Sequence, residues 1–447
     1  MLQKGEEHRV NGLGYVIAAG LLVQFVVDRV VEVKNLRVLR YHPPPELADT
    51  YDDERFRLAQ CYLYDNSRFG WVSDGAFLLI LFGFWFGGGF AALDGWVRSA
   101  ALHPVLEGVV FIAVLAGGWW ALSLPFQIFH TFVIEERHGF NRATPAIFAT
   151  DQIKTLLLSI LLGVPLLSAI VAIFLRAGAH AWLWCWIAAG LYVMTVQTLA
   201  PTWILPLFNR FEPLVDGRLR RELFRYVRSI RFPLENVFVM DGSKRSDKSN
   251  AFFTGFGRRR RIVLLDTLVR DLSVSELVAV VAHEAGHAKR RHLFWMTALI
   301  MARIGCWLFV FSLVMRYEVL YRAFGVATIS VQAGLVFFCL LLAPLDLFTG
   351  PAIHALSRRN EREADRFAAA TTGDPEALIS ALKKLSSRNL GNPTPHPYMV
   401  WRRYSHPPIL ERITNIRADG SASARETAEP RGAAPEAVPC RERNGLE

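Results

Sequence analysis

Residues 283–287 of the chain read His-Glu-Ala-Gly-His, a spacing that can bind a metal ion and activate water. Just before them, Ser273 and Glu276 stand three residues apart in front of an apolar run, which is the pattern of a helix-capping box. On the predicted helix, His283 and His287 lie on the same face, one turn apart, and can share one ion. Glu284 is rotated by about 100° and can reach water at the ion rather than the ion itself. The segment therefore predicts a zinc site with Glu284 as the base.

The alternative is that the two histidines are ordinary solvated residues of a helix surface, since a motif with three fixed positions also arises by chance. The surroundings argue against this alternative, because an apolar stretch precedes the motif and a basic segment and another apolar run follow it. A buried histidine pair without a ligand would be costly in free energy. We therefore expect one tightly bound zinc ion per chain.

A zinc site that keeps an open position for water needs a third protein ligand. His292 is a poor candidate, because it follows His287 by five residues and lies beside a basic run. Glu361 and Asp365 are four residues apart and share one helix face. Glu361 can complete a site of two histidines and one glutamate, and Asp365 can accept the second ring N–H of a ligand histidine. Spacing favours Glu361 but leaves Glu363 open, although we expect Glu363 to point elsewhere.

The segments around these residues are largely apolar. Of the 447 residues, 52% are hydrophobic and 20% are charged, which excludes a disordered chain and is unlike an ordinary soluble domain. Five cysteines, an odd number, are too few for a disulfide scaffold. Seven stretches are long enough to cross a bilayer, which takes about 20 apolar residues. They lie near residues 11–30, 72–93, 105–126, 153–175, 181–200, 294–315 and 328–349. Gln24 and Asp28 lie inside the first of them.

The positive charges of the connecting segments predict the orientation. Lys and Arg collect in 31–71 and 201–293, which lie on the same side of an odd number of spans, and such residues favour the cytoplasm. We therefore expect a multi-pass integral membrane protein with its N-terminus outside and its zinc motif and C-terminus in the cytoplasm. The net charge of +10 does not indicate a nucleic-acid partner, because the basic run Arg258–Arg261 has no interleaved aromatic residues. A turn facing solvent or lipid headgroups explains this run.

We divide the chain into five parts. They are a membrane region with five spans (1–200), an α+β insert with the zinc-motif helix (201–293), two further spans (294–349), a helical segment with the third ligand (350–417) and a tail (418–447). Within the insert we predict a helix over 219–230, strands near Val237 and over 262–265, and turns at Asp241 and Gly255. The tail from Ala418 shows no apolar period and is expected to be disordered.

Further motifs give the chain a family resemblance. It resembles the integral-membrane zinc endopeptidases of the CAAX prenyl protease 1 type in its zinc motif, in the pair Glu361 and Asp365, and in four other segments. These segments are Ala200–Phe208, Ser249–Phe252, Arg261–Leu268 and Tyr404–Pro408. The resemblance covers most of residues 10–417. It implies a mainly α membrane protein, in which seven transmembrane helices surround a water-filled intramembrane chamber and a small cytoplasmic α+β metallopeptidase unit covers the zinc site.

The same resemblance implies roles for individual residues. Glu361 is implied as the third zinc ligand, and Asn250 and His406 are implied to face the substrate. Asn250 can hydrogen-bond a substrate backbone, and its alternative is a simple turn asparagine. His406 can donate to a developing oxyanion, and its alternative is a structural histidine before Pro407. The compact size of the chain indicates a bacterial inner-membrane member.

The predicted reaction is hydrolysis of a peptide bond in a membrane-associated or CAAX-type protein or peptide. Glu284 would take a proton from water and pass it to the leaving amine, while the peptide lies extended beside a strand of the 237–265 region. One alternative is a heat-shock-type membrane quality-control metalloprotease, a class that usually has four spans. Another is a transporter with a structural zinc, although such zinc sites are usually rich in cysteine. The substrate, its prenylation and the oligomeric state stay open.

Overall fold

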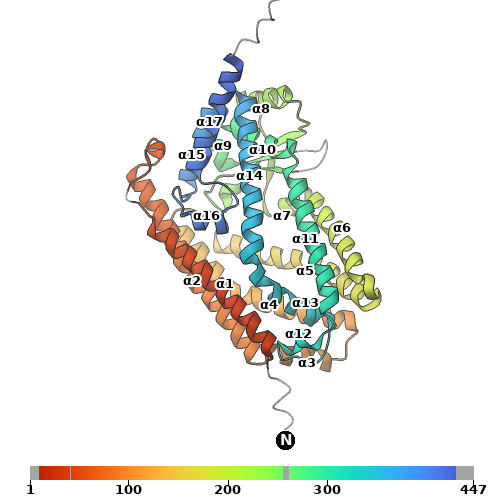
Figure 1. Ribbon diagram of the computed structural model, residues 1–447. Coiled ribbons are helices and arrows are strands. Elements are labelled where there is room, and N and C mark those ends of the chain that lie inside the picture. The colour runs from red at the N-terminus through yellow and green to blue at the C-terminus, as the bar shows by residue number, and fades with distance from the viewer. Residues whose placement is uncertain (1–9, 41, 255–260, 429–447) are drawn as a thin grey trace, which may run out of the picture.

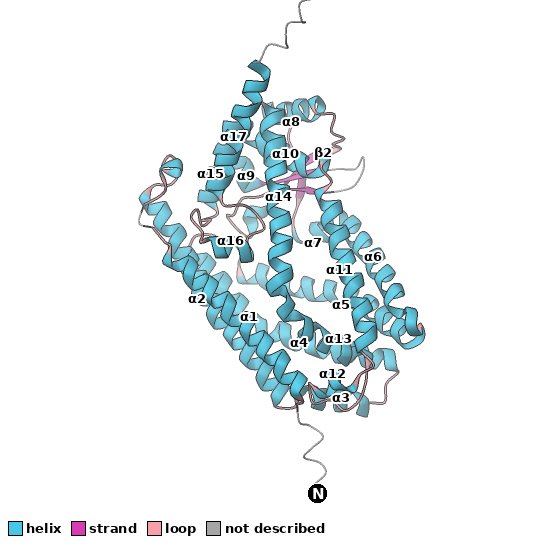
Figure 2. Cartoon of the chain, viewed as in Figure 1, coloured by secondary structure: helices cyan, strands magenta, loops and turns pink. Residues whose placement is uncertain are grey.

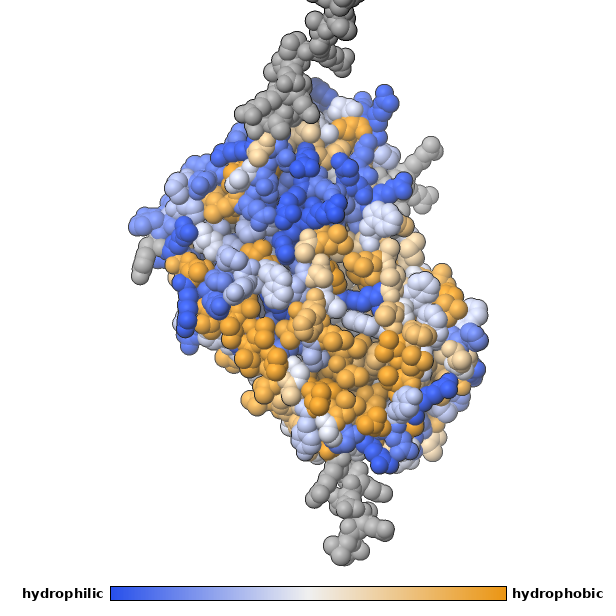
Figure 3. Space-filling view, viewed as in Figure 1, coloured by the Kyte–Doolittle hydropathy of each residue, from blue (hydrophilic) through white to orange (hydrophobic). Residues whose placement is uncertain are grey.

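The computed structural model describes residues 10–40, 42–254 and 261–428, and most of them are helical (Figures 1 and 2). Long helices make up the lower part of the view, and a small sheet with shorter helices makes up the upper part. Hydrophobic residues gather over the lower part of the visible face, whereas hydrophilic residues gather over the upper part (Figure 3). The chain is therefore divided into a membrane region and a polar unit, as the sequence predicts.

Six helical segments of the described residues are long and apolar enough to cross a membrane. The first three are α2 (Asp53–Phe86), α4 (Pro104–Phe129) with the π-helix η3 (His130–Glu135), and α5 (Pro145–Arg176). The fourth joins α6 (Ala181–Leu199), the π-helix η5 (Ala200–Ile204) and α7 (Leu205–Phe208). The last two are α11 (His292–Val314) and the pair α13 (Val331–Leu342) and α14 (Asp346–Thr372). Two short helices, α3 (Gly89–Ser99) and α12 (Glu318–Arg322), lie at the lower end (Figure 1).

The first predicted span is the helix α1 (Gly12–Arg37), which is not among these six. The count of seven spans is therefore not confirmed. At 26 residues, α1 is about 39 Å long, enough to cross a hydrocarbon core of about 30 Å. It exposes Leu22, Val23 and Val26, whereas Asp28 is buried. The charged residue of this stretch, Asp28, thus faces the protein and not the surroundings.

The membrane helices bury little of their surface against one another. In the most apolar window of α5, only 6% of the residues are buried, and in that of α4 only 11%. Polar side chains between these helices find partners within the protein: Gln152 accepts from Trp120 and donates to Gln127. Lys154, which the sequence places inside a span, donates to the carbonyl of Leu207 at 2.8 Å. These polar side chains inside the membrane region are therefore hydrogen-bonded within the protein.

The polar unit contains a four-stranded sheet with the order β1-β2-β4-β3. Its strands are β1 (Phe211–Pro213), β2 (Asn236–Met240), β3 (Ala251–Thr254) and β4 (Arg261–Leu265). The two strands that the sequence predicts, β2 and β4, pair in parallel, and β3 forms an antiparallel edge against β4. The predicted helix over 219–230 is α8 (Arg218–Ser229). Gly255, Gly257 and Arg258–Arg260 lie outside the described residues, and Arg261 pairs with Glu235.

Helices cover this sheet and build the largest hydrophobic core of the described chain. They are α8, α9 (Asp266–Asp271), α10 (Val274–Lys289), α15 (Pro375–Arg388) and α17 (Ile409–Ala428). The short helix α16 (Pro397–Arg403) packs against α1 and α14 instead. Leu277 and Val281 of α10 are buried in this core together with Ile262 and Leu264 of β4. Helix α17 continues ten residues past Ala418, where the sequence predicts a disordered tail, and residues 429–447 lie outside the described residues.

Candidate active site

Helix α10 begins at the predicted capping box and carries the zinc motif. The backbone N–H of Ser273 donates to Glu276 Oε2 at 2.7 Å, and the Ser273 hydroxyl accepts from the N–H of Glu276. Glu276 also binds Lys384 of α15 at 2.8 Å, which ties the start of the helix to its neighbour. With the register set in this way, the apolar face of α10 packs into the core, and His283 and His287 turn toward α14.

A glycine lets α10 and α14 approach closely at this point. A Cβ atom at Gly286 would lie 3.1 Å from the Cα of Ala364, which is tighter than ordinary packing. Ala285 and Ala364 are both fully buried at the same contact. The small residue between the two histidines therefore brings Glu361, one turn before Asp365 on α14, next to the imidazoles.

The nitrogen and oxygen atoms of this cluster lie close enough together to bind one metal ion. His283 Nε2 and His287 Nε2 are 3.1 Å apart, and each lies 3.3–3.4 Å from a carboxylate oxygen of Glu361. Four-coordinate zinc with bonds of about 2.0–2.1 Å places its ligand atoms roughly 3.3 Å apart. Glu361 Oε2 is buried and has no hydrogen-bond partner among the described residues. The cluster thus fits one zinc ion, and Glu361 Oε2 is available as a ligand for it.

The outer atoms of His283 lie against a buried ion pair. His283 Nδ1 is 2.8 Å from Asp365 Oδ1, and Asp365 lies one helical turn after Glu361. Arg412 of α17 donates to both oxygens of Asp365, at 2.6 and 2.8 Å, and its Nη2 is 3.8 Å from Glu361. Three helices therefore meet at the cluster, and the arginine compensates the charge of the two carboxylates.

His287 has a corresponding chain of partners on the other side. Its Nδ1 is 3.1 Å from Nδ1 of His292, whose Nε2 is 3.4 Å from Glu363 Oε2. Glu363 is bound to Arg359, and its side chain is one-third exposed. It faces His292, whereas Glu361 faces the imidazoles of His283 and His287. Glu363, the other candidate for the third ligand, therefore contacts His287 only through His292.

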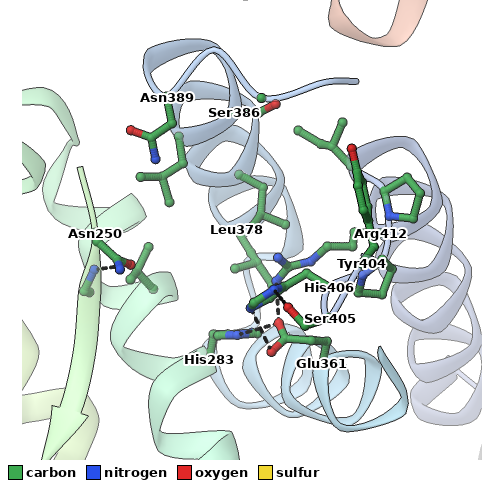
Figure 4. A pocket seen from close by; sticks show the side chains of 18 of the residues that line it. Asn250, His283, Glu361, Leu378, Ser386, Asn389, Tyr404, Ser405, His406 and Arg412 are labelled. Atoms are coloured by element: carbon green, nitrogen blue, oxygen red, sulfur yellow. Dashed lines mark hydrogen bonds and ion pairs between the residues drawn. The ribbon is translucent and has the colours of Figure 1, made fainter. Parts of the chain in front are cut away.

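A cavity of about 590 Å³ opens in front of the cluster (Figure 4). His283, Glu284 and Glu361 line this cavity, together with residues from β3, α15, the segment 403–408 and α17. Burial raises the pKa of Glu284 above its usual range, although the nearby imidazoles oppose this shift. A carboxylate that is more basic than usual, next to a metal-binding cluster and open to a cavity, can act as a general base.

The two residues implied to face a substrate also line this cavity (Figure 4). His406 is 63% exposed at its side chain, and its Nε2 lies 3.4 Å from Glu361 Oε1. The Ser405 hydroxyl lies 2.9 Å from the other ring nitrogen of His406. Asn250 precedes β3, and its side-chain oxygen accepts from the N–H of Ala251 at 2.9 Å. The structure therefore brings both residues to the cavity that contains Glu284.

Arg412 is the main site residue that sequence reasoning missed. Its signal was present, because Ile409, Ile413 and Ile416 mark the buried face of α17 and a basic residue stands beside this series. A charged residue next to such a face needs a buried partner. The spacing of His292 from His287 argues against a role as a ligand, but it does not reveal that His292 lies behind His287.

Comparisons with known proteins agree with this geometry. The family model of the CAAX prenyl protease N-terminal region, with five membrane helices, matches residues 32–210, and that of peptidase family M48 matches residues 213–419. A CAAX prenyl protease 1 homolog from Arabidopsis thaliana is 33% identical over 414 residues, which cover 89% of this chain and 95% of that protein. The human homolog is 32% identical over 429 residues, covering 84% of this chain and 89% of that protein.

A solved structure shares the whole arrangement. The crystal structure of S. mikatae Ste24p superposes with a TM-score of 0.86 at 29% identity and covers 91% of this chain and 100% of that one. The fold and the metal-binding cluster thus define a multi-pass membrane zinc metallopeptidase. The chain belongs to the CAAX prenyl protease 1 family, as its motifs predict. These matches favour a peptidase of this family over the quality-control protease and the transporter.

Proposed function

We propose that His283, His287 and Glu361 hold one zinc ion per chain, and that Glu284 is the general base of peptide-bond hydrolysis. The observation that carries this proposal is the contact of two imidazole nitrogens 3.1 Å apart with the two oxygens of one carboxylate at 3.3–3.4 Å, beside Glu284, which lines the same cavity. Bound there, zinc would supply a Lewis acid that activates water and polarises the scissile carbonyl. Asp365 would hold the ring of His283 in the tautomer that presents Nε2 to the ion.

The side chains of the cavity divide the remaining steps among them. Glu284 takes the proton of the attacking water and later delivers it to the leaving amine. His406, whose Nε2 lies beside the cluster, donates a hydrogen bond to the oxyanion of the tetrahedral intermediate. Asn250 stands at the start of the open edge strand β3 and binds the backbone of a peptide that extends along that edge.

The substrate and the orientation follow from the family and from the charge pattern. We propose that the chain cleaves membrane-associated proteins or peptides, including those with a C-terminal CAAX sequence, which the names of the relatives specify for those proteins. The positive-inside rule supports a cytoplasmic cavity and an N-terminus outside. The compact size of the chain favours a bacterial inner membrane.

Metal analysis combined with a peptidase assay tests the assignment. His283→Ala and His287→Ala should lose stoichiometric zinc, because each removes one of three ligands. Glu284→Gln should keep zinc and lose peptide hydrolysis, since the ligands remain and the base is absent. Full zinc in both histidine variants would refute the ligand set, and near-normal turnover of Glu284→Gln would refute the base.

A further inference from the structure

The start of β3 presents two backbone positions to the open edge of the sheet. The carbonyl of Asn250 accepts from the N–H of Leu265 at 3.1 Å, so the backbone of Asn250 faces β4. In an antiparallel ladder, successive residues direct their N–H and C=O groups to opposite sides of the strand. The neighbours Ser249 and Ala251 therefore face away from β4, toward the edge that a substrate strand would join.

At Ser249 this edge is already occupied by a side chain. Asn389 Oδ1 accepts from the N–H of Ser249 at 2.9 Å, and Asn389 Nδ2 donates to the carbonyl of Ser249 at 2.9 Å. These are the two hydrogen bonds that one residue of a paired strand would form. Ser249 is 3% exposed, so its backbone groups have no access to water or to another chain.

At Ala251 the edge is covered by the neighbouring side chain of Asn250 and not by a residue from another element. Among the described residues, its N–H is bonded only to the side-chain oxygen of the adjacent Asn250, at 2.9 Å. Rotation of that one side chain releases the N–H to a substrate and frees the Asn250 amide to contact the same peptide. A substrate strand therefore cannot pair with the backbone of Ser249, but it can pair with that of Ala251.

The turn that carries Asn389 is held in place from several directions. The backbone N–H of Asn389 closes α15 onto Leu385 at 3.0 Å, and the next residue, Leu390, is buried in a left-handed conformation with φ +49°. A non-glycine residue keeps such a conformation only where its surroundings enforce it. Arg388 makes two bonds of 2.7 Å to Asp271. The amide of Asn389 is thus a fixed part of the cavity wall, which it shares with His283 and Glu361 (Figure 4).

We propose that Asn389 is the end-stop of the substrate strand and thereby a specificity-determining residue that sets which peptide bond is cleaved. This inference rests on the proposed peptidase function. A peptide that pairs at Ala251 cannot continue its pairing to Ser249, so it must end or turn away there. The distance along the chain from this point to Glu284 and His406 then determines which carbonyl reaches the metal-binding cluster.

The test uses the purified full-length chain with its zinc and a peptide of uniform repeating sequence, so that side chains do not select the register. Mass spectrometry identifies the cleaved bond. The intact chain should cleave one dominant bond. Asn389→Ala frees the edge at Ser249, and because outward-facing positions recur every two residues, a second product should appear two residues away. Two gained hydrogen bonds correspond to a rise of about tenfold in the fraction of that product.

Ser386→Ala is the matched control. Ser386 lines the same cavity near the end of the same helix, but its hydroxyl contacts Tyr51 and not the sheet edge. This variant should keep the wild-type bond. An unchanged product pattern in zinc-loaded Asn389→Ala would overturn the proposal.

A second variant covers the case in which Asn389→Ala does not fold. Asn389→Asp has the same shape and keeps the acceptor for Ser249 N–H, but it loses the donor to the Ser249 carbonyl. It should show the same displaced product in a smaller fraction, and a single wild-type bond would count against the end-stop. Absence of any cleavage by zinc-loaded wild-type protein would instead overturn the proposed function, and the end-stop with it.

Discussion

Arg402 and Asp28 form a buried ion pair although 374 residues separate them along the chain. The arginine Nε donates to the aspartate at 2.8 Å, and both side chains are less than one-tenth exposed. Arg403 also reaches Asp28 at 2.9 Å, and Arg402 binds Asp346 of α14 at 2.9 Å. Because His406 lies three residues after Arg403, helix α1 holds the segment that brings His406 to the cavity.

Asp28→Asn should therefore weaken the protein and slow catalysis together. Loss of charged hydrogen bonds in a buried setting should lower the free energy of unfolding by about 1.5–3 kcal/mol. The kcat should fall with zinc content unchanged, since His406 loses its support and the ligands do not. Thermal unfolding, metal analysis and steady-state kinetics measure the three quantities.

The control for this prediction is the same chemical change at an exposed pair. Glu318→Gln breaks the contact with Arg322, where both side chains are more than half exposed, and should cost less than about 1 kcal/mol. Equal losses in the two variants would show that Asp28 contributes no more than a surface charge.

The sequence predicts the parts of the site that depend on local spacing. The capping box at Ser273 specifies the start of α10, and i,i+4 spacing places His283 with His287 and Glu361 with Asp365. The pairing of Asp28 with Arg402 depends on how α1 meets α16, which no spacing along the chain encodes. From the sequence alone, Asp28 is therefore an unfavourable charged residue within a predicted membrane span.

Two other features were missed for related physical reasons. The strand β3 has only four residues and stands next to glycines, so its propensity signal is too short to separate it from a turn. The position of Arg412 depends on how α17 packs across α14, which is a tertiary contact. Local spacing thus predicts which side chains share a helix face. It does not predict that α17 packs beside them and adds Arg412 to the site.

Arg412 is expected to act through Asp365. Arg412→Met removes both hydrogen bonds to Asp365 and leaves the aspartate free to turn away from His283, so activity or zinc affinity should fall about 10–100-fold. Arg412→Lys keeps the charge but cannot form both bonds, and it should remain impaired. Arg417→Met, which removes an exposed pair on the same helix, should be silent. Full activity of Arg412→Lys would show that charge alone suffices.

The orientation in the membrane gives an independent prediction. The first residues of α1 and the end of α17 lie at opposite ends of the molecule (Figure 1). A reporter fused before residue 11 should be outside the cell, and one fused after the last residue should be cytoplasmic. Both reporters on one side would mean an even number of spans, and α1 would then not cross the membrane.

Zinc binding to the metal-free protein should depend on pH. Burial alone would lower the pKa of His283, but the carboxylates of Asp365 and Glu361 outweigh it and raise the pKa to about 9. An imidazole must be neutral to bind zinc, so a proton competes with the ion below that pH. Zinc affinity should therefore rise about tenfold per pH unit up to about pH 9 and then level off.

Calorimetry in buffers of different ionisation enthalpy counts the protons that zinc releases, and about one should come from His283 at neutral pH. Asp365→Asn removes one of the carboxylates that raise this pKa, so its affinity should level off at a lower pH. An affinity that is constant across this range would contradict the protonated state of His283.

The last prediction separates Glu361 from Glu363, which composition cannot distinguish. Two residues apart on a helix means nearly opposite faces, and of the two glutamates it is Glu361 whose carboxylate oxygens lie 3.3–3.4 Å from the ligand histidines. Glu361→Ala should leave a two-histidine site, weaken zinc binding by orders of magnitude and abolish hydrolysis. Glu363→Ala should reduce activity by less than about tenfold, because it loosens only His292 behind His287. Zinc titration and peptide cleavage measured on both variants decide between them. If Glu363→Ala loses zinc while Glu361→Ala retains it, the third-ligand assignment is wrong.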